Sequence, residues 1–465
     1  MWKPLTLEMA SGRLSKRFTA RRLAVEALLL VDAGRTAQQA LSAVLEAYPA
    51  DKRERRLASE LTYGLLRNEG RIRFLLDRLL PRSADLPPAF LHILGLAVYT
   101  RIALERIPFR AAVDEAVKEA RCRFGAALAG VANGVLRSLE RLGKAVFSPS
   151  FYALPSDGDV LDPSAAAKMA WMRLARFHSL PLWIVRLWTE HYGPADALRL
   201  MRRASSRPWR GLRVNMRARG SDRLHAALAA LEDDFRFRPC GASGFVAAPD
   251  FRFPPILGRP LDDWIEDGLL SRQSCGSQSV LKALGFGTRR ERPVWDMCAG
   301  FGGKTAFLLE RGTTVALATD VACARLSQLG GDCARLGLAP PPAVLSDARR
   351  PAVRAFDGDM LLDVPCSGLG VLAGRPDIRR ARMTKRSIRL FPKMQAAILD
   401  AAAALLRPGC DLAYVTCTLV PQENGRIIDD VLARDAGLEC LREWQSPASC
   451  PWIEGMYGAL LGRRF

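Results

Sequence analysis

The stretch PVWDMCAGFGGKTAFLLERGTTVALATD, residues 293–320, gives the clearest indication of the fold in the carboxyl-terminal part of the chain. It begins with a short apolar run that ends in an acid, passes through a glycine-rich loop into a helical pattern, and closes with a second apolar run that also ends in an acid. A strand, a helix and a strand in this order make up the unit from which parallel sheets are built. Residues 293–320 therefore predict an α/β domain.

The same alternation continues toward the carboxyl terminus. Later apolar runs that end in an acid or a cysteine are AVLSD (343–347), DMLLDVPC (359–366) and DLAYVTC (411–417). Together these runs predict a doubly wound, mostly parallel sheet with helices on both faces, in a domain that spans residues 286–465. Ligands of such sheets bind beyond the carboxyl ends of the strands, where every one of these polar residues is expected.

The amino-terminal part of the chain has a helical pattern instead. Apolar residues recur every three or four positions through most of residues 15–143, for example in RRLAVEALLLV (21–31), which predicts an all-helical domain over residues 1–145. Pro, Ser, Gly and Asp cluster in residues 146–164 and predict a linker. Residues 165–285 combine an amphipathic helix with an alternating strand and predict a small mixed α/β module, which we expect to act as a linker or to bind RNA.

Charge and composition indicate which class of molecule the protein binds. The 465 residues contain 68 Lys and Arg against 48 Asp and Glu, a net charge of +20, with arginines scattered along the chain. Such a balance favours nucleic acid over an anionic membrane, because no basic amphipathic helix with a matching apolar face is evident. No apolar run approaches the roughly 18 residues that span a bilayer, and residues 1–22 lack the apolar core of a secretory signal, so we expect a cytoplasmic protein.

Cysteine and histidine positions limit the chemistry. Eleven cysteines without a single Cys-x-x-Cys spacing argue against a zinc site and a disulfide framework, so we expect free thiols. All four histidines precede residue 226. Catalysis in the carboxyl-terminal half must therefore use carboxylate, thiol, hydroxyl or lysine groups, and we expect no metal.

The glycine-rich loop predicts a small-molecule site, with a simple tight turn as the alternative. Gly300, Gly302 and Gly303 let the backbone turn sharply and direct N–H groups outward at the start of a helix. The phosphate-binding P-loop pattern fails, because Cys298 stands where that motif needs glycine, and the dinucleotide fingerprint fails at Thr305.

Two acids at strand ends extend this prediction. Asp320 ends the second strand, seventeen residues after Gly303, where doubly wound folds present a carboxylate to ribose hydroxyls. Asp347 ends the third strand and is placed to accept a hydrogen bond from an adenine amino group. Either residue alone could instead cap a helix.

Two cysteines follow the next two predicted strands. Cys366 follows the fourth and Cys417 closes the fifth. If these strands are neighbours, the two thiols lie within about 10 Å, because adjacent strands are separated by roughly 4.8 Å. The remaining cysteines outside the glycine-rich loop are expected to be structural or exposed.

Several segments resemble the RNA cytosine-5 methyltransferases: DMCAGFGGKT, DMLLDVPCSGLGV, RPDIRR (375–380), residues 393–424 with their TC dipeptide, and EGMYGALL (454–461). The amino-terminal half, with RRLAVEALL, ELTYGLLRN, AAVDEAVKEAR and VANGVLRSLERLG, resembles the NusB-like RNA-binding module. This domain order is similar to the Sun/Fmu (RsmB) branch, which methylates small-subunit ribosomal RNA. The resemblance implies a Rossmann-like fold for the catalytic domain, S-adenosylmethionine as cofactor, ribosomal RNA as partner, and a monomer.

The resemblance also assigns roles to residues. Asp320 would bind the ribose of the cofactor, Asp347 the adenine, and Asp363 would lie by the methionyl end and the target base. The loop that would hold the cofactor is Cys298, Ala299, Gly300, Phe301, Gly302, Gly303 and Lys304, in which Gly300 and Phe301 replace the usual x-Pro of the family.

The two thiols have separate tasks in this family. Cys417 matches the nucleophile and Cys366 the residue that assists product release. A thiolate that adds to C6 of cytosine makes C5 nucleophilic, so covalent catalysis divides one difficult step into easier ones. Methylation of transfer RNA is one alternative activity, and a catalytically silent RNA-binding assembly factor is another.

Overall fold

The computed structural model describes residues 18–154, 163–241, 243–288, 291–382 and 384–464. The predicted linker over 146–164 and the amino-terminal residues 1–22 fall partly outside these ranges. The chain forms two compact units, of which unit 1 is Met1–Arg207 with Leu372–Thr384, and unit 2 is Pro208–Val371 with Lys385–Phe465. The domain boundaries proposed from the sequence at 145, 164 and 285 stay predictions.

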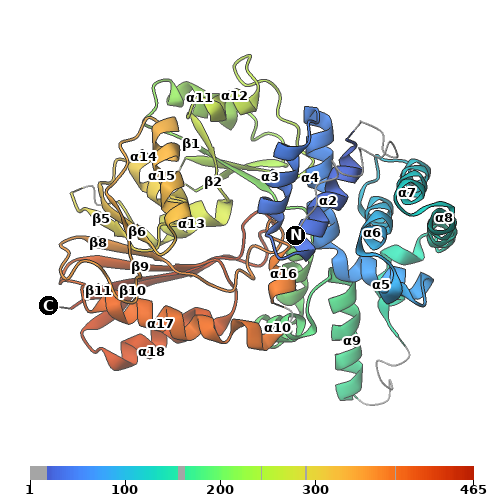
Figure 1. Ribbon diagram of the computed structural model, residues 1–465. Helices are drawn as coiled ribbons and strands as arrows, with labels where there is room; N and C mark the ends of the chain where they lie inside the picture. Colours follow the sequence, from blue (N-terminus) through green and yellow to red (C-terminus); the bar gives the residue numbers. More distant parts are fainter. Residues whose placement is uncertain (1–17, 155–162, 242, 289–290, 383, 465) are drawn as a thin grey trace. The chain divides into compact units, whose positions relative to one another are not determined.

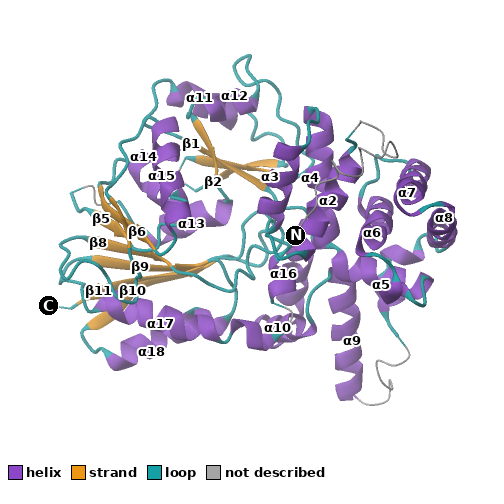
Figure 2. Ribbon diagram, in the orientation of Figure 1, coloured by secondary structure: helices purple, strands orange, loops and turns teal. Residues whose placement is uncertain are grey.

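Unit 1 is helical, as the three-and-four spacing predicts (Figures 1 and 2). Its helices are α2 (Ala20–Asp32), α3 (Ala37–Ala47), α4 (Lys52–Arg67), α5 (Glu69–Leu79), α6 (Pro88–Ala103), α7 (Phe109–Phe124), α8 (Ala126–Arg141), α9 (Pro163–His178) and α10 (Leu182–Ser205), with 3₁₀ turns η1 (Ser83–Asp85), η2 (Ala145–Phe147) and η3 (Pro149–Tyr152). Helix α6 is apolar on all sides and lies at the centre of the core, with Phe90, Leu94 and Ala97 fully buried. Helices α2, α4, α5, α7 and α8 pack around it.

A short segment from the carboxyl-terminal half belongs to unit 1. This segment, Leu372–Thr384, contains α16 (Ile378–Ala381). Arg379 is buried and donates hydrogen bonds to the carbonyls of Arg67 and Ala204, which lie at the carboxyl ends of α4 and α10. Helix carboxyl ends carry partial negative charge, so these carbonyls stabilise the buried guanidinium.

Arg380 fastens the same segment to two further helices. Its guanidinium forms ion pairs with Asp32 at 2.7 Å and with Glu69 at 2.6 Å, at the end of α2 and the start of α5. Adjacent arginines therefore join this segment to the ends of four helices.

Unit 2 contains a large and a small sheet (Figure 2). The large sheet is made of β5 (Val294–Asp296), β6 (Val315–Asp320), β7 (Ala343–Leu345), β8 (Asp359–Asp363), β9 (Asp411–Thr416), β10 (Leu438–Gln445) and β11 (Tyr457–Arg463), in the order β10-β11-β9-β8-β5-β6-β7. Strands β5 to β9 are parallel, while β11 runs antiparallel between β9 and β10. This confirms the predicted doubly wound, mostly parallel sheet; the antiparallel pair at its edge was not predicted.

Helices cover both faces of the large sheet (Figure 1). They are α13 (Cys275–Leu284), α14 (Gly303–Glu310) and α15 (Cys323–Arg335) on one face, and α17 (Leu390–Ala403) and α18 (Gly425–Arg434) on the other. Strand β9 explains the arrangement: Leu412 and Tyr414 join the core under α17 and α18, whereas Ala413 and Val415 join the core under α13 and α14. Both faces of the strand are buried, which accounts for its continuous apolar run.

The small sheet has the order β2-β3-β1-β4, with β1 (Arg210–Val214), β2 (Phe237–Cys240), β3 (Gly244–Ala247) and β4 (Leu270–Arg272), and is accompanied by α11 (Ser221–Ala229) and α12 (Leu261–Glu266). Strand β1 carries Arg213, which forms a buried ion pair with Glu310 at the end of α14. Asn215 donates from its amide to the carbonyl of Leu336 at 2.8 Å. These contacts join the small sheet to the helices of the large one.

The prediction that the cysteines are all free thiols is wrong for two of them. Cys240, the last residue of β2, and Cys275, the first residue of α13, form a disulfide. Their Cα atoms are 5.7 Å apart, a separation that a disulfide can span. Spacing along the sequence could not reveal the pair, because the fold brings together residues that are 35 positions apart.

Candidate active site

The predicted site residues gather at the carboxyl edge of the parallel strands. Asp320 ends β6, Asp363 ends β8, and Cys417 immediately follows β9. Because β6 and β8 both pair in parallel with β5, and β9 pairs in parallel with β8, these ends lie along one edge of the sheet. The site is therefore built where strand-end residues of a doubly wound sheet are expected to meet.

The glycine-rich loop takes the sharp path that its sequence predicts. Gly300 and Gly302 have φ angles of +57° and +82°, in the left-handed region that favours glycine. A Cβ atom on Gly302 would come within 2.3 Å of Leu329, whereas Gly300 faces open space. The exposed Phe301 lies between them. The loop thus leaves open space beside Gly300 at the start of α14, which suits a small polar ligand.

Asp320 is tied to this loop. One carboxylate oxygen accepts from the Gly300 N–H at 3.0 Å, and the other accepts from the Ala322 N–H at 2.8 Å. The half-exposed Arg325 adds an ion pair at 2.9 Å. This carboxylate is fixed in position beside the glycine turn, where it can accept from ligand hydroxyls.

Asp347 lies two residues beyond the end of β7. It accepts two hydrogen bonds from the guanidinium of Arg349, at 3.0 Å from Nε and 2.6 Å from Nη2. These bonds lower the pKa of the Asp347 carboxyl. Any contact of Asp347 with an adenine amino group would share the carboxylate with Arg349, so its role stays a prediction.

Lys304 and Asp363 form an ion pair inside the site. The ammonium of Lys304, in the first turn of α14, is 2.6 Å from an oxygen of Asp363. Lys304 is 8% exposed and Asp363 is 34% exposed, so the carboxylate remains accessible while its charge is balanced from the buried side. Sequence reasoning placed both residues near the ligand but did not predict their pairing.

Asp296, to which the sequence assigned no role, lies deeper in the same edge. It ends β5, is fully buried and accepts a hydrogen bond from the Thr305 hydroxyl at 2.7 Å. Burial raises its pKa to about 7, although the Thr305 bond opposes that rise. Cys298, two residues on, also has a pKa raised by burial, so its thiol stays protonated.

The two predicted cysteines meet. The Sγ atoms of Cys366 and Cys417 are 3.1 Å apart, and the Cys417 N–H donates to the sulfur of Cys366 at 3.3 Å. The hydrogen bond from the Cys366 thiol lowers the pKa of Cys417, and the ammonium of Lys304 acts in the same direction. The hydrogen bond with Cys417, together with burial, raises the pKa of Cys366. The pair therefore favours one thiolate, on Cys417, hydrogen-bonded by one thiol.

A buried polar network holds the loop that carries Cys366. Glu423, in η6 (Pro421–Glu423), accepts from the Ser367 N–H at 2.8 Å and from the Gln395 amide at 3.0 Å. The same amide donates to the Pro365 carbonyl at 2.9 Å. Sequence reasoning gave Gln395 and Glu423 no role, although polar residues inside apolar segments are a usable signal of such networks.

No cluster of potential metal ligands was found among the residues that the structure describes. No helix in the described ranges is long and apolar enough to cross a membrane. The edge of the sheet instead offers a nucleophilic sulfur, a paired carboxylate and a glycine turn with an adjoining carboxylate. This set suits covalent chemistry on an electrophilic ring carbon next to a bound small molecule.

Comparison with known proteins finds a family match for each half of the chain. Residues 286–451 match the family described as 16S rRNA methyltransferase RsmB/F, and residues 19–141 match the NusB family. The Probable ribosomal RNA small subunit methyltransferase B of Bacillus subtilis (strain 168) is 30% identical over 432 residues, covering 89% of this chain and 88% of that protein. The Ribosomal RNA small subunit methyltransferase B of Salmonella typhi is 30% identical over 437 residues, covering 91% and 93%.

Solved structures share the fold. The crystal structure of PH0851 matches with a TM-score of 0.71 at 19% identity, covering 97% of this chain and 100% of that one. A methyltransferase homolog protein from Pyrococcus horikoshii matches with a TM-score of 0.51 at 21% identity, covering 66% of this chain and 100% of that one.

Proposed function

This chain belongs to the 16S rRNA methyltransferase RsmB/F family, and we propose that it methylates C5 of a cytosine in small-subunit ribosomal RNA through a covalent bond between Cys417 and C6. The observation that carries the proposal is the 3.1 Å separation of the Cys366 and Cys417 sulfurs at the ends of adjacent strands. One thiolate and one thiol in contact supply both a nucleophile and a proton-transfer group.

The site fits S-adenosylmethionine, the cofactor. Open space adjoins Gly300, and the Asp320 carboxylate that accepts from its N–H would also accept from ribose hydroxyls. Phe301, 47% exposed beside that turn, offers a flat apolar surface. When bound, the cofactor supplies an electrophilic methyl group. Residues Cys298 to Lys304, with Asp320 and Asp347, would hold it.

Cys417 begins the reaction. Its thiolate adds to C6 of the cytosine, forming an S–C6 bond and moving the C5–C6 π electrons toward C5, which becomes nucleophilic. Asp363 lies with Lys304 on the same edge, where its carboxylate accepts a hydrogen bond from the cytosine amino group and fixes the ring. Lys304 balances the negative charge that accumulates on the ring during the attack.

Cys366 completes the reaction. While Cys417 is a thiolate, its charge keeps the proton on Cys366. Once Cys417 is bound in a neutral thioether, that repulsion is gone and Cys366 can release its proton to water. The resulting thiolate accepts the C5 proton of the methylated ring, the C5–C6 double bond forms again, and the S–C6 bond breaks to return the thiolate of Cys417.

A methylation assay tests this proposal. The purified protein would be incubated with labelled S-adenosylmethionine and with either small-subunit ribosomal RNA or transfer RNA from a strain that lacks the gene, and the nucleosides separated by mass spectrometry. We expect 5-methylcytidine in the ribosomal RNA only. Methylation of transfer RNA alone would show that transfer RNA is the substrate in place of ribosomal RNA. Binding of the cofactor without any methyl transfer would indicate a catalytically silent assembly factor.

A further inference from the structure

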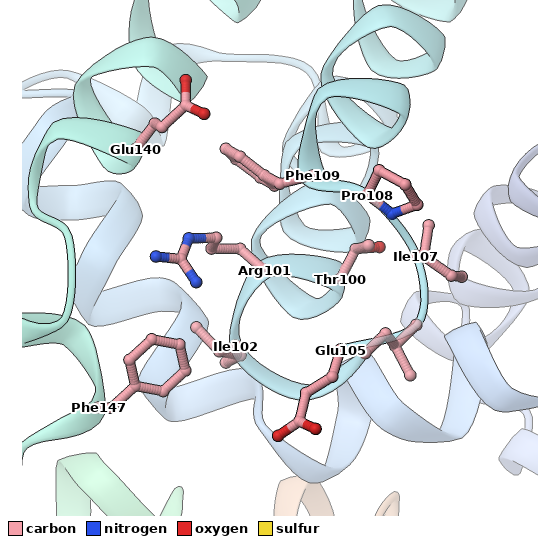
Figure 3. Close-up of a pocket in the computed structure, with 10 residues that line it drawn as sticks. Thr100, Arg101, Ile102, Glu105, Ile107, Pro108, Phe109, Glu140 and Phe147 are labelled. Carbon is pink, nitrogen blue, oxygen red and sulfur yellow. The ribbon is translucent and has the colours of Figure 1, made fainter.

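A cavity of about 340 Å³ lies within unit 1, where the end of α6 and the loop before α7 face the end of α8 and η2 (Figure 3). The side chains that matter for its chemistry are Arg101, Glu105, Phe109, Glu140 and Phe147. In Figure 3 the guanidinium of Arg101 points toward the side of the cavity bordered by Glu140 and Phe147. The cavity thus combines flat, cationic and anionic groups in a space that can hold one planar heterocycle.

Flat surfaces dominate one side of the cavity. The guanidinium carbon of Arg101 is 5.1 Å from the ring centroid of Phe147 and 6.0 Å from that of Phe109. The Phe147 side chain is 41% exposed. Aromatic rings and arginine guanidinium groups are the surfaces on which unpaired RNA bases stack.

The carboxylates specify the hydrogen bonds that an occupant must make. Glu105 and Glu140 form no ion pair with any residue in the described part of the chain, so their oxygens are open to a ligand. A carboxylate only accepts hydrogen bonds, and guanine presents two adjacent donors, N1–H and the N2 amino group, on one edge.

Basic residues adjoin the cavity residues along the chain. Directly after Glu105, Phe109 and Glu140, and next to η2, stand the exposed side chains of Arg106, Arg110, Arg141 and Lys144. Cations at the rim contact phosphates and orient a strand, while groups inside a pocket read the base. The same rim disfavours a cationic peptide as the occupant.

We propose that this cavity binds a single unpaired guanosine of the RNA substrate. The inference rests on the proposed function for the choice of RNA as ligand, and adds a base-reading site in unit 1. The base stacks on Phe147 and Arg101, the Glu140 carboxylate accepts from its N1–H and N2 amino groups, and the basic rim contacts the flanking phosphates.

The test measures binding of the full chain to three labelled heptanucleotides, UUUGUUU, UUUAUUU and UUUUUUU, by fluorescence anisotropy at one salt concentration. We expect wild-type protein to bind the guanosine oligomer about tenfold more tightly than the other two, within the range of discrimination that one bidentate contact between a side chain and a base supplies. Phe147→Ala should weaken binding of the guanosine oligomer by roughly 5- to 100-fold. Glu140→Gln should remove most of the preference for guanosine over adenosine.

Phe235→Ala is the matched control, because Phe235 is an exposed phenylalanine of unit 2, at 73% exposure. It should leave all three affinities unchanged. Equal binding of the three oligomers by wild-type protein, an unchanged affinity of Phe147→Ala for the guanosine oligomer, or a guanosine preference that survives in Glu140→Gln would overturn the proposal. Methyl transfer measured on the same preparations separates the two proposals: a guanosine preference without methyl transfer supports the cavity and contradicts the enzyme, and methyl transfer without the preference does the reverse.

Discussion

Removal of Arg213 should destabilise unit 2 strongly. Its guanidinium meets Glu310 in two parallel hydrogen bonds, Nε to Oε2 at 2.6 Å and Nη2 to Oε1 at 2.7 Å, and the two side chains are 2% and 3% exposed. The remaining nitrogen donates to Gln273 and to the Gly303 carbonyl. Arg213→Met leaves the Glu310 charge buried and unpaired, a change that costs about 3–5 kcal/mol.

Two further variants make the magnitude interpretable. Arg272→Met, on β4 of the same small sheet, breaks an ion pair with Asp262 whose partners are 67% and 46% exposed, so it should cost at most about 1 kcal/mol. Arg213→Met combined with Glu310→Leu removes both buried charges and should recover most of the lost stability.

The effect of Arg213→Met also depends on pH. Burial raises the pKa of Glu310, and Arg213 opposes that rise. Without Arg213 the folded-state pKa is higher still, so the folded chain binds a proton that the unfolded chain does not. The stability that comes from this bound proton is present at low pH and is lost as pH rises. The loss in free energy of unfolding caused by Arg213→Met should therefore be smaller at about pH 5 than at about pH 8.

The assay is urea titration followed by hydrogen exchange of peptides from β1 and α14, which reports the stability of the unit that holds the pair. A deficit for Arg213→Met no larger than that of Arg272→Met, or one that grows as pH falls, would refute this reasoning.

Three further results are expected. Burial raises the pKa of Asp296 to about 7, so its contribution to stability is present below about pH 4 and is lost as pH rises through about 7. Asp296→Asn should abolish this decrease in the free energy of unfolding, measured by urea titration at several pH values. An unchanged dependence of the free energy of unfolding on pH would contradict it. Arg379→Met should lower the free energy of unfolding of unit 1 by about 1.5–3 kcal/mol, because two buried helix-end carbonyls lose a charged donor. Arg53→Met, at an exposed position of α4 in the same unit, should have little effect in the same titration, and equal effects would count against the capping role. The logarithm of RNA affinity should fall linearly with the logarithm of salt concentration from about 50 to about 200 mM, because Lys and Arg side chains that bind phosphates release counterions from the RNA. A flat response would exclude net charge as the driving force of binding.

Much of the site follows from periodicity alone. Runs that end in Asp320, Asp363 and Cys417 are short, apolar and separated by helical patterns, so the carboxyl ends of the strands could be located before the strand order was known. The contact between Cys366 and Cys417 followed once β8 and β9 were taken as neighbours, and the structure confirms that pairing.

Contacts between distant parts of the chain could not be predicted in this way. Arg213 and Glu310 are 97 positions apart, and nothing in either local pattern selects the partner. Arg379 is one of many arginines in a basic chain, and its role depends on helix ends contributed by other segments. The hydrogen bonds from Arg349 to Asp347 are local, yet the sequence equally allowed Asp347 to stay open to a ligand.

In the proposed mechanism Cys417 forms the covalent bond and Cys366 releases the product. The most direct measurement is trapping of the protein on RNA that contains 5-azacytidine, with the covalent complex resolved by denaturing electrophoresis for wild type, Cys417→Ala and Cys366→Ala. We predict a complex with wild type and with Cys366→Ala, and none with Cys417→Ala. A complex that survives Cys417→Ala and disappears in Cys366→Ala would reverse the two roles and contradict the account.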